Sequence, residues 1–182
     1  IENGGDFVMT VMETLKHCRL FEFLSDDELE LIATKVEERH YRKGDFICRE
    51  GAWGDSMYII GQGEIKIVKK LDTETVWDIT SLRHGDFFGE VALVDGSPRT
   101  ASGIALVNST VLELYGRDFK MLMNAGDALS NKMLESLLRV LINRIRATDD
   151  IVTNIMAEKL KGESGHSATM REIVSRAMVS RK

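Results

Sequence analysis

The sequence predicts a mixed α+β fold, an antiparallel β jelly-roll barrel flanked by N-terminal helices and by one long C-terminal helix. Between positions 41 and 115, short segments rich in Ile, Val, Tyr and Phe alternate with turns that contain Gly and Asp. No long helical stretch separates these segments, which is typical of antiparallel strands rather than of parallel strands joined by helices. Helical periodicity precedes the region and returns after it, most clearly over positions 128–161.

The composition is that of a globular protein with a complete core. At 182 residues the chain fits one domain, or one domain with appended helices. The net charge of -5 argues against a general nucleic-acid-binding surface, and no apolar run approaches the length of a membrane span. We therefore expect no membrane association and no nucleic acid bound by this chain alone.

Cysteine, histidine and the first residues give the remaining compositional expectations. Cys18 and Cys48 stand far apart in no metal-binding spacing, which favours reduced thiols in a cytoplasmic protein. The four histidines are scattered, so no metal site is predicted and nothing indicates catalysis. The start of the chain does not resemble a signal peptide and has no initiator Met, so we expect a piece of a longer protein.

The first 40 residues are predicted to form helices. Phe7 to Cys18 has apolar residues on one side, as an amphipathic helix does. Ser25 and Glu28 have the spacing of a capping box, in which each side chain bonds the other residue's backbone N–H. The buried face of the second helix is predicted to carry Leu29, Ile32, Ala33 and Val36.

Positions 41–115 are predicted to form the barrel. The clearest strands are Tyr58 to Ile60, Glu64 to Lys69, Val76 to Leu82, Ser102 to Val107 and Val111 to Tyr115. Four apolar residues in this region are candidates for lining a purine pocket, although core packing is the favoured interpretation for each of them. These four are Met57, Tyr58, Val68 and Phe87.

Positions 116–161 are predicted to form a short helix up to about Asn124 and then a long helix from about Ala128 to about Lys161. Apolar residues of the long helix alternate at spacings of four and three, if Thr148 is counted among them. They are Leu134, Leu138, Leu141, Ile145, Val152 and Ile155. This heptad pattern favours a coiled-coil homodimer through the 134–155 seam, with packing on the chain's own barrel as the alternative. Positions 162–182 are a linker and tail without an assigned role.

A stretch between positions 88 and 102 carries the chemistry of an anion site. Gly89 lets a ligand approach the backbone, and the exposed amides of a short helical turn attract phosphate. Arg99 can make a forked contact with two phosphate oxygens. Glu90 only accepts hydrogen bonds, so it suits a sugar hydroxyl. Together these residues indicate a small anionic ligand that carries hydroxyls.

The order Phe-Gly-Glu, one residue, Ala-Leu, a variable turn, Pro-Arg, one residue, Ala resembles the phosphate-binding cassette of cyclic nucleotide-binding domains. The glycine pattern from Gly44 to Gly63 resembles the barrel signature of the same family. The resemblance implies a cyclic AMP or cyclic GMP ligand and no cofactor. It implies phosphate contacts from Arg99 and backbone amides, and a ribose 2′-hydroxyl contact from Glu90. The predicted site is Phe88, Gly89, Glu90, Val91, Ala92, Arg99, Thr100, Ala101 and Thr148.

Two threonines in this set have more than one interpretation. The catabolite-activator branch of the family closes its long helix over the base, and Thr148 with Asp149 could take that part. Alternatively, the Thr148 hydroxyl bonds back to a carbonyl of its own helix. Thr100 follows Arg99 as in many eukaryotic relatives that bind cyclic GMP, yet cyclic AMP binders carry it too. The bacterial resemblance of the long helix favours cyclic AMP.

The leading hypothesis is a non-enzymatic sensor that transmits occupancy through its C-terminal helices. The main alternative is the ligand-sensing part of a catabolite-activator-type transcription factor with an incomplete DNA-binding unit, since positions 169–181 weakly resemble the start of a helix-turn-helix. A dimerisation module that has lost its ligand is disfavoured by the intact Glu90 and Arg99. A cupin-like enzyme would need clustered metal ligands that the strands lack.

Overall fold

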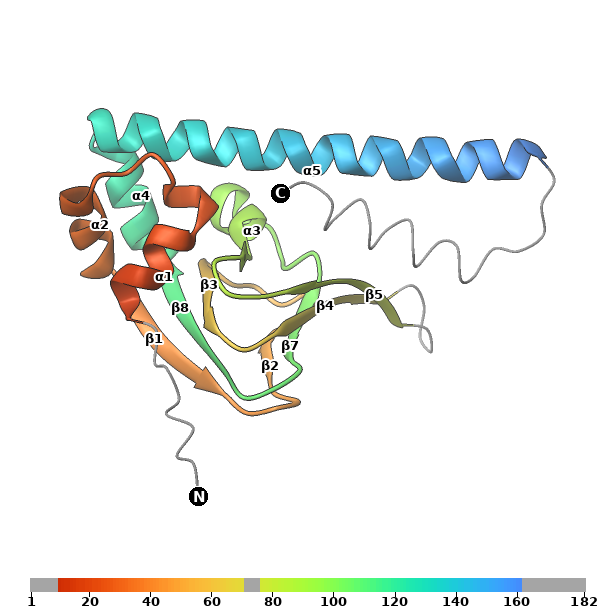
Figure 1. Cartoon of the computed structure of the whole chain (residues 1–182), viewed down its shortest axis with the longest axis horizontal. Coiled ribbons are helices and arrows are strands. Elements are labelled where there is room, and N and C mark those ends of the chain that lie inside the picture. The colour runs from red at the N-terminus through yellow and green to blue at the C-terminus, as the bar shows by residue number, and fades with distance from the viewer. Residues whose placement is uncertain (1–9, 71–75, 162–182) are drawn as a thin grey trace, which may run out of the picture.

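The computed structural model describes residues 10–70 and 76–161 (Figure 1), with side chains described as far as residue 155. The described part of the chain begins with two short helices, α1 (Val11–His17) and α2 (Asp26–Ala33), separated by the 3₁₀ turn η1 (Arg19–Phe21). Thr10 and Ser25 each cap a helix in a complete capping box, and the one at Ser25 with Glu28 is the one predicted. Positions 7–9 of the predicted first helix lie outside the described residues.

The second helix ends earlier than its apolar pattern indicates. It stops at Ala33, and Val36 begins strand β1 (Val36–Tyr41) instead of continuing the buried helical face. The predicted boundary at position 40 therefore places most of the first strand with the helices. The reason is that Val36 pairs with Leu114 of a central strand, and this pairing overrides the helical spacing.

Within the described residues, eight strands form two antiparallel four-stranded sheets. Their orders are β1-β8-β3-β6 and β2-β7-β4-β5, and the two sheets do not close into one continuous barrel. The strands after β1 are β2 (Phe46–Cys48), β3 (Ser56–Gln62), β4 (Ile65–Lys70), β5 (Val76–Leu82), β6 (Phe87–Phe88), β7 (Ser102–Ala105) and β8 (Ser109–Tyr115). All five strands predicted as the clearest are present, and the antiparallel arrangement is confirmed.

Alternate residues of β3 belong to two separate hydrophobic clusters. Met57 and Ile59 pack with the helices, whereas Tyr58 and Ile60 pack between the sheets. The division follows from the period of two along a strand, which sends successive side chains to opposite faces. One face of the first sheet is therefore covered by helices, and the other faces the second sheet.

Three helices complete the fold. They are α3 (Glu90–Asp95), between β6 and β7, then α4 (Gly116–Asn124) and the 34-residue α5 (Ala128–Lys161). α5 begins against α2, where Lys132 pairs with Glu28 at 2.8 Å, and it buries Leu129, Met133 and Leu137 in the helix-side cluster. Figure 1 shows it continuing beyond the sheets. The end of α4 and both bounds of α5 match the prediction, whereas α4 begins at Gly116, two residues earlier than predicted. The predicted tail at 162–182 lies outside the described residues.

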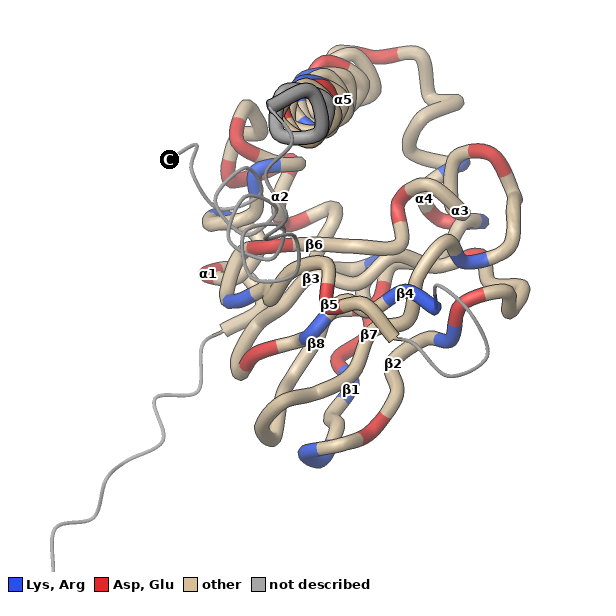
Figure 2. Tube along the Cα trace, turned by 90° about the vertical axis from the view of Figure 1, so that its right-hand side faces the viewer, with Lys and Arg blue, Asp and Glu red and all other residues tan. Residues whose placement is uncertain are grey.

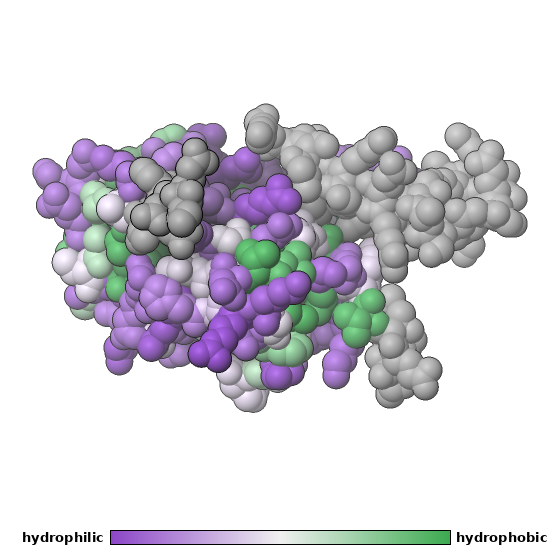
Figure 3. All heavy atoms as spheres, turned by 60° about the horizontal axis from the view of Figure 1, so that its bottom comes forward, coloured by the Kyte–Doolittle hydropathy of each residue, from purple (hydrophilic) through white to green (hydrophobic). Residues whose placement is uncertain are grey.

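None of the described helices is long and apolar enough to cross a membrane. The face of the molecule in Figure 3 is largely hydrophilic, with apolar atoms gathered near its middle.

Candidate phosphate and sugar site

Gly89 joins the short strand β6 to α3 in a conformation that favours glycine. Its φ is +85°, in the left-handed region that other residues rarely adopt. A Cβ atom at this position would lie 2.6 Å from Nη1 of Arg99 and 3.1 Å from the Ser56 carbonyl oxygen. Gly89 is therefore required both by its backbone conformation and by the close approach of Arg99.

Arg99 is buried beside this turn, with 5% of its surface exposed. Its Nη1 donates to the Gly89 carbonyl at 3.1 Å, and its Nη2 donates to the Ser56 hydroxyl at 3.2 Å. Its backbone is held as well, because its N–H donates to Ala52 at 2.9 Å and its carbonyl accepts from Gly51 at 2.8 Å. Hydrogen bonds thus hold Arg99 both at its guanidinium and at its backbone.

Glu90 is the first residue of α3 and is almost fully buried, with 2% of its surface exposed. Its carboxylate forms an ion pair with Arg144 of α5, which sequence reasoning did not single out. Arg144 also donates to the Phe87 carbonyl at 3.3 Å and lies over the Phe87 ring. The only sequence signal for Arg144 is a basic residue in an amphipathic helix, which is too common to identify a site.

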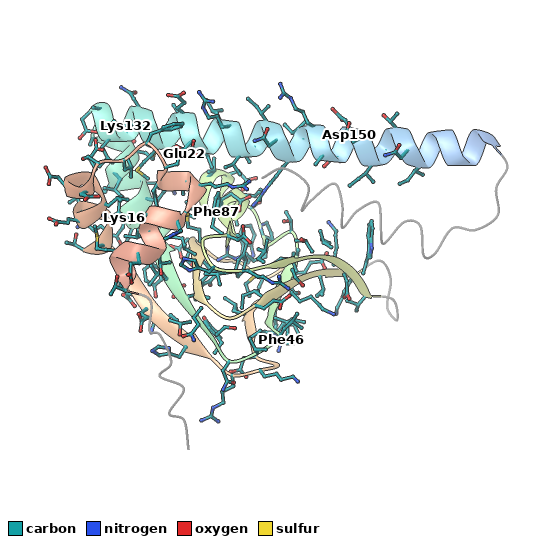
Figure 4. All side chains as sticks on the ribbon, in the orientation of Figure 1. Lys16, Glu22, Phe46, Phe87, Lys132 and Asp150 are labelled. Carbon is teal, nitrogen blue, oxygen red and sulfur yellow. The ribbon has the colours of Figure 1, made fainter. Side chains whose placement is uncertain are left out.

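A groove of about 1620 Å³ separates α5 from the sheets and contains the cassette. Figure 2 looks along α5 and shows the helix lying across from β6 and α3. In Figure 4, Phe87 lies below α5 close to the sheets, and Asp150 lies on α5 farther along the helix. The groove wall includes apolar residues of the second sheet, namely Ile67, Ile79 and Leu82. It therefore combines a charged end with an apolar surface.

Eight of the nine predicted site residues line this groove. They are Phe88, Gly89, Glu90, Val91, Ala92, Arg99, Thr100 and Ala101. Thr148 is the exception, because it is exposed and its hydroxyl donates to the Arg144 carbonyl at 2.9 Å. Within this chain, Thr148 makes the bond to its own helix that was the alternative interpretation, and it does not join the groove.

The four candidate purine contacts divide in the same way. Met57, Tyr58 and Val68 are buried in the core and do not line the groove, as the favoured interpretation holds. Phe87 is buried and also lines the groove.

Burial raises the pKa of the Tyr58 hydroxyl and of the Cys48 thiol. Both groups therefore stay protonated at neutral pH, and the charges at this end of the groove come from Arg99, Glu90 and Arg144. Among the described residues, no cluster of His, Cys, Asp and Glu could hold a metal ion.

Comparison with known protein families agrees with the anion site that Arg99 and the Gly89 turn form. The family described as "Cyclic nucleotide-binding domain" matches residues 38–125, which include the whole cassette. Residues 38–125 of this chain are therefore a cyclic nucleotide-binding domain. Structural neighbours of this domain include regulatory subunits of cyclic-AMP-dependent kinases and a catabolite activator protein, and the predicted resemblance is confirmed.

Individual relatives of the domain come from several classes of regulated protein. A cyclic-GMP-dependent protein kinase of Drosophila melanogaster (isozyme 2, forms cD5/T2) is 43% identical over 89 residues, which are 48% of this chain and 10% of the kinase. The regulatory subunit of the cyclic-AMP-dependent protein kinase of Aspergillus fumigatus is 41% identical over 110 residues, or 60% of this chain and 26% of that protein. This chain therefore spans about a quarter or less of these two relatives.

Solved structures share the fold of the domain. The cyclic-AMP-bound structure of PfPKA-R (141-441) superimposes with a TM-score of 0.57 at 33% identity, covering 61% of this chain and 39% of that one. The catabolite activator protein of Thermus thermophilus has a TM-score of 0.69 at 22% identity, covering 89% of this chain and 85% of that one. The second likeness extends the shared fold to the C-terminal helices.

Proposed function

We propose that this chain is a sensor module that binds cyclic AMP, or less favourably cyclic GMP, and transmits occupancy through α4 and α5. The observation that carries the proposal is the arrangement of Arg99. It is a buried guanidinium held against the Gly89 turn at one end of a large groove. Its role is to bind and regulate, and the proposal assigns no catalytic residue.

The phosphate is proposed to bind between Arg99 and the first turn of α3. Two of the five N–H groups of a guanidinium are used here by Gly89 and Ser56, among the residues that the structure describes. The others can donate to a phosphate oxygen. The first amides of a helix such as α3 have no intrahelical acceptor, so they can donate to the same anion. Thr100 and Ala101 border the same end of the groove.

The sugar and the base are proposed to extend along the groove from there. A carboxylate has two oxygens with room for several donors, so Glu90 can keep Arg144 and still accept from a ribose hydroxyl. The apolar wall of Ile67, Ile79 and Leu82 suits a purine face. Burial of the base against these residues would add a hydrophobic contribution to the phosphate contacts.

Transmission follows from the ion pair between Glu90 and Arg144. A ribose hydroxyl and Arg144 bind the same carboxylate, so the occupancy of the site alters how α5 is held. A ligand shifts the position of α5 only by as much as its affinity differs between the two arrangements. We infer that α5 is the element through which the module reports its ligand.

The choice of cyclic AMP over cyclic GMP rests on the bacterial resemblance of the long helix and on the cyclic-AMP-bound relative. Kinases named for cyclic GMP are relatives too, and Thr100 beside Arg99 is compatible with both purines. The substitution Thr100→Ala distinguishes a preference for cyclic AMP from a preference for cyclic GMP. If the protein prefers cyclic GMP, this variant weakens cyclic GMP binding more than cyclic AMP binding.

Isothermal titration of the purified chain with each nucleotide tests the proposal. We expect saturable binding, and Arg99→Ala should weaken it by about 3 kcal/mol or more, at least about a hundredfold in the dissociation constant, because a buried phosphate loses its charge partner. Arg99→Lys keeps the positive charge but cannot make the two-pronged guanidinium contact. Its affinity for the nucleotide should therefore lie between those of wild type and Arg99→Ala. Equal binding by Arg99→Ala and wild type contradicts the assignment.

A second candidate function is the ligand-sensing part of a catabolite-activator-type transcription factor. A likeness to the N-terminal domain of a transcriptional regulator from Streptomyces coelicolor A3(2), at 26% identity over 76% of this chain, supports it. The proposed homodimer seam is compatible with either function.

A further inference from the structure

A buried chain of polar side chains runs from Arg99 into the first sheet. Arg99 Nη2 donates to Ser56 Oγ at 3.2 Å, and Ser56 Oγ donates to Glu113 Oε1 at 2.8 Å. All three residues are buried, with exposed fractions of 5%, 4% and 9%. Ser56 begins β3 and Glu113 lies in the neighbouring β8, so the backbone pairing of two central strands brings them together.

Glu113 is an unusual residue for its position. Its neighbours Leu112 and Leu114 are completely or almost completely buried in the helix-side cluster, while Glu113 points to the opposite face of the sheet, where Tyr58 is its cross-strand partner. A buried carboxylate is costly unless hydrogen bonds and an opposite charge compensate it. No step proposed above for ligand binding uses Glu113.

The second oxygen of Glu113 is fixed from the outer edge of the sheet. Oε2 accepts from the Tyr115 hydroxyl at 3.2 Å and from Arg39 Nε of β1 at 3.3 Å. Arg39 also donates to the Tyr115 hydroxyl at 2.9 Å, and its side chain is 46% exposed. The carboxylate is therefore held on both oxygens and lies between two arginines.

We propose that Ser56 and Glu113 are positioning residues for Arg99, a role that rests on the function proposed above. A serine hydroxyl has one hydrogen, and Ser56 Oγ lies 2.8 Å from Glu113 Oε1 and 3.2 Å from the Tyr58 hydroxyl. The shorter contact, to a carboxylate that can only accept, assigns the hydrogen to Glu113. The lone pairs of Ser56 consequently face the Arg99 guanidinium. The carboxylate thus fixes the direction of the hydroxyl, and the hydroxyl holds Arg99 ready before a ligand arrives.

Two effects of Glu113 on phosphate binding oppose each other. Its negative charge repels a phosphate, while its hold on Ser56 lowers the ordering cost that Arg99 pays on binding. Arg39 offsets the charge, and Ser56 separates the carboxylate from the guanidinium. We therefore expect the hold of Glu113 on Ser56 and Arg99 to matter more than its repulsion of the phosphate. Losing Glu113 should then weaken nucleotide binding.

The first experiment observes Arg99 in the protein without ligand. In nitrogen-detected spectra of guanidinium groups, a held arginine shows slow rotation about its Cζ–Nε bond, with separate Nη signals. We expect this for wild type and averaged signals for Ser56→Ala. Ser109→Ala is the matched control, since Ser109 is a 4% exposed serine of β8 whose hydroxyl bonds Val107 instead. Unchanged Arg99 signals in Ser56→Ala would overturn the proposal.

The second experiment measures nucleotide affinity by titration. Ser56→Ala should weaken binding about tenfold, the size expected for one hydrogen bond to a charged group, while Ser109→Ala stays within about twofold of wild type. In an Arg99→Ala background, adding Ser56→Ala should change the affinity less than twofold, because the residue acts through Arg99. Equal losses in both backgrounds would indicate a merely structural role and contradict the proposal.

Glu113 is tested with a pair of variants. Glu113→Leu removes the acceptor for Ser56 and should weaken binding about as much as Ser56→Ala. Glu113→Gln keeps an acceptor oxygen and should recover most of the affinity. Binding by Glu113→Leu equal to that of wild type rejects the role of Glu113. If wild type binds neither nucleotide, the proposed function fails, and the spectra without ligand still decide whether Ser56 holds Arg99.

Discussion

At the scale of single residues, the site depends on charges in places where an unpaired charge would be costly. Arg99 and Glu90 are each at most 5% exposed, and each has a specific partner. The arginine fits only because positions 54 and 89 are glycines, whose missing Cβ atoms would lie within 2.8 Å of its guanidinium. A small change at a glycine should therefore disturb the charged group beside it.

Gly89→Ala and Gly96→Ala form a matched pair that tests this. Both glycines flank α3 with positive φ, +85° and +69°. A Cβ at position 96 meets nothing within 4 Å, whereas one at 89 meets Arg99 and Ser56. Gly96→Ala should cost about 1 kcal/mol of unfolding free energy from backbone strain. Gly89→Ala should cost more and also weaken nucleotide binding. Urea denaturation and titration measure the two effects, and equal behaviour of both variants contradicts the packing argument.

At the scale of elements, α5 is held to the rest of the molecule by its apolar first turns and by ion pairs. Ion pairs between described residues link Lys132 to Glu28 of α2 and Arg144 to Glu90 of α3. They lie more than three helical turns apart on α5 and on either side of the apolar contacts near Leu137. This arrangement is what the proposed transmission from α3 to α5 requires.

Removing Arg144 should destabilise the protein more than removing an exposed arginine of the same helix. Arg144→Ala leaves the 2% exposed Glu90 without its counter-charge, which we expect to cost about 2 kcal/mol, below the usual range because Arg144 itself is 45% exposed. Arg139→Ala removes a surface pair with Glu135 and should cost under about 0.5 kcal/mol. Chemical denaturation compares them, and similar losses would show that Glu90 does not depend on Arg144.

The contact between α2 and α5 should make stability depend on pH. The hydrogen bond from Lys132, followed by the bond from the Ser25 backbone, lowers the pKa of Glu28 from its ordinary value of 4.5. A lowered pKa in the folded state gives stability above pH 4.5 that disappears as the pH falls through the folded value. The melting temperature should therefore drop on acidification, and the drop should be smaller in Glu28→Gln. Melting curves between pH 7 and pH 3, with Glu30→Gln as control, measure this; equal drops in all three proteins reject it.

At the scale of the whole molecule, the long helix exposes an apolar stripe among the described residues. Leu134, Leu138, Ile145 and Val152 have exposed fractions of 44%, 50%, 61% and 43%. Leu141 and Ile155 of the same predicted seam are half-buried. Exposed apolar residues in heptad spacing on a 34-residue helix favour pairing with a second copy of that helix.

Sedimentation of wild type and of Leu138→Glu tests the homodimer proposed here. A charge in the middle of a paired seam is costly, so the variant should sediment as a monomer at concentrations where wild type is a dimer. Glu135→Lys, at an exposed position on the same helix, serves as the control and should stay dimeric. Its melting temperature also shows whether the fold tolerates a charge change on α5. A monomeric wild type contradicts the seam.

The sequence by itself determined the element types, the antiparallel pattern, the end of α4, the bounds of α5, and eight residues of the groove. These follow from local periodicity and from a contiguous cassette, which a chain reveals without folding. Only the tertiary structure decided that Val36 is a strand residue, that Thr148 bonds its own helix, and that Arg144, Ser56 and Glu113 surround the cassette. Glu113 is 14 residues from Arg99 in sequence, Ser56 is 43 and Arg144 is 45. Their contacts depend on strand register and helix packing, which no local pattern encodes.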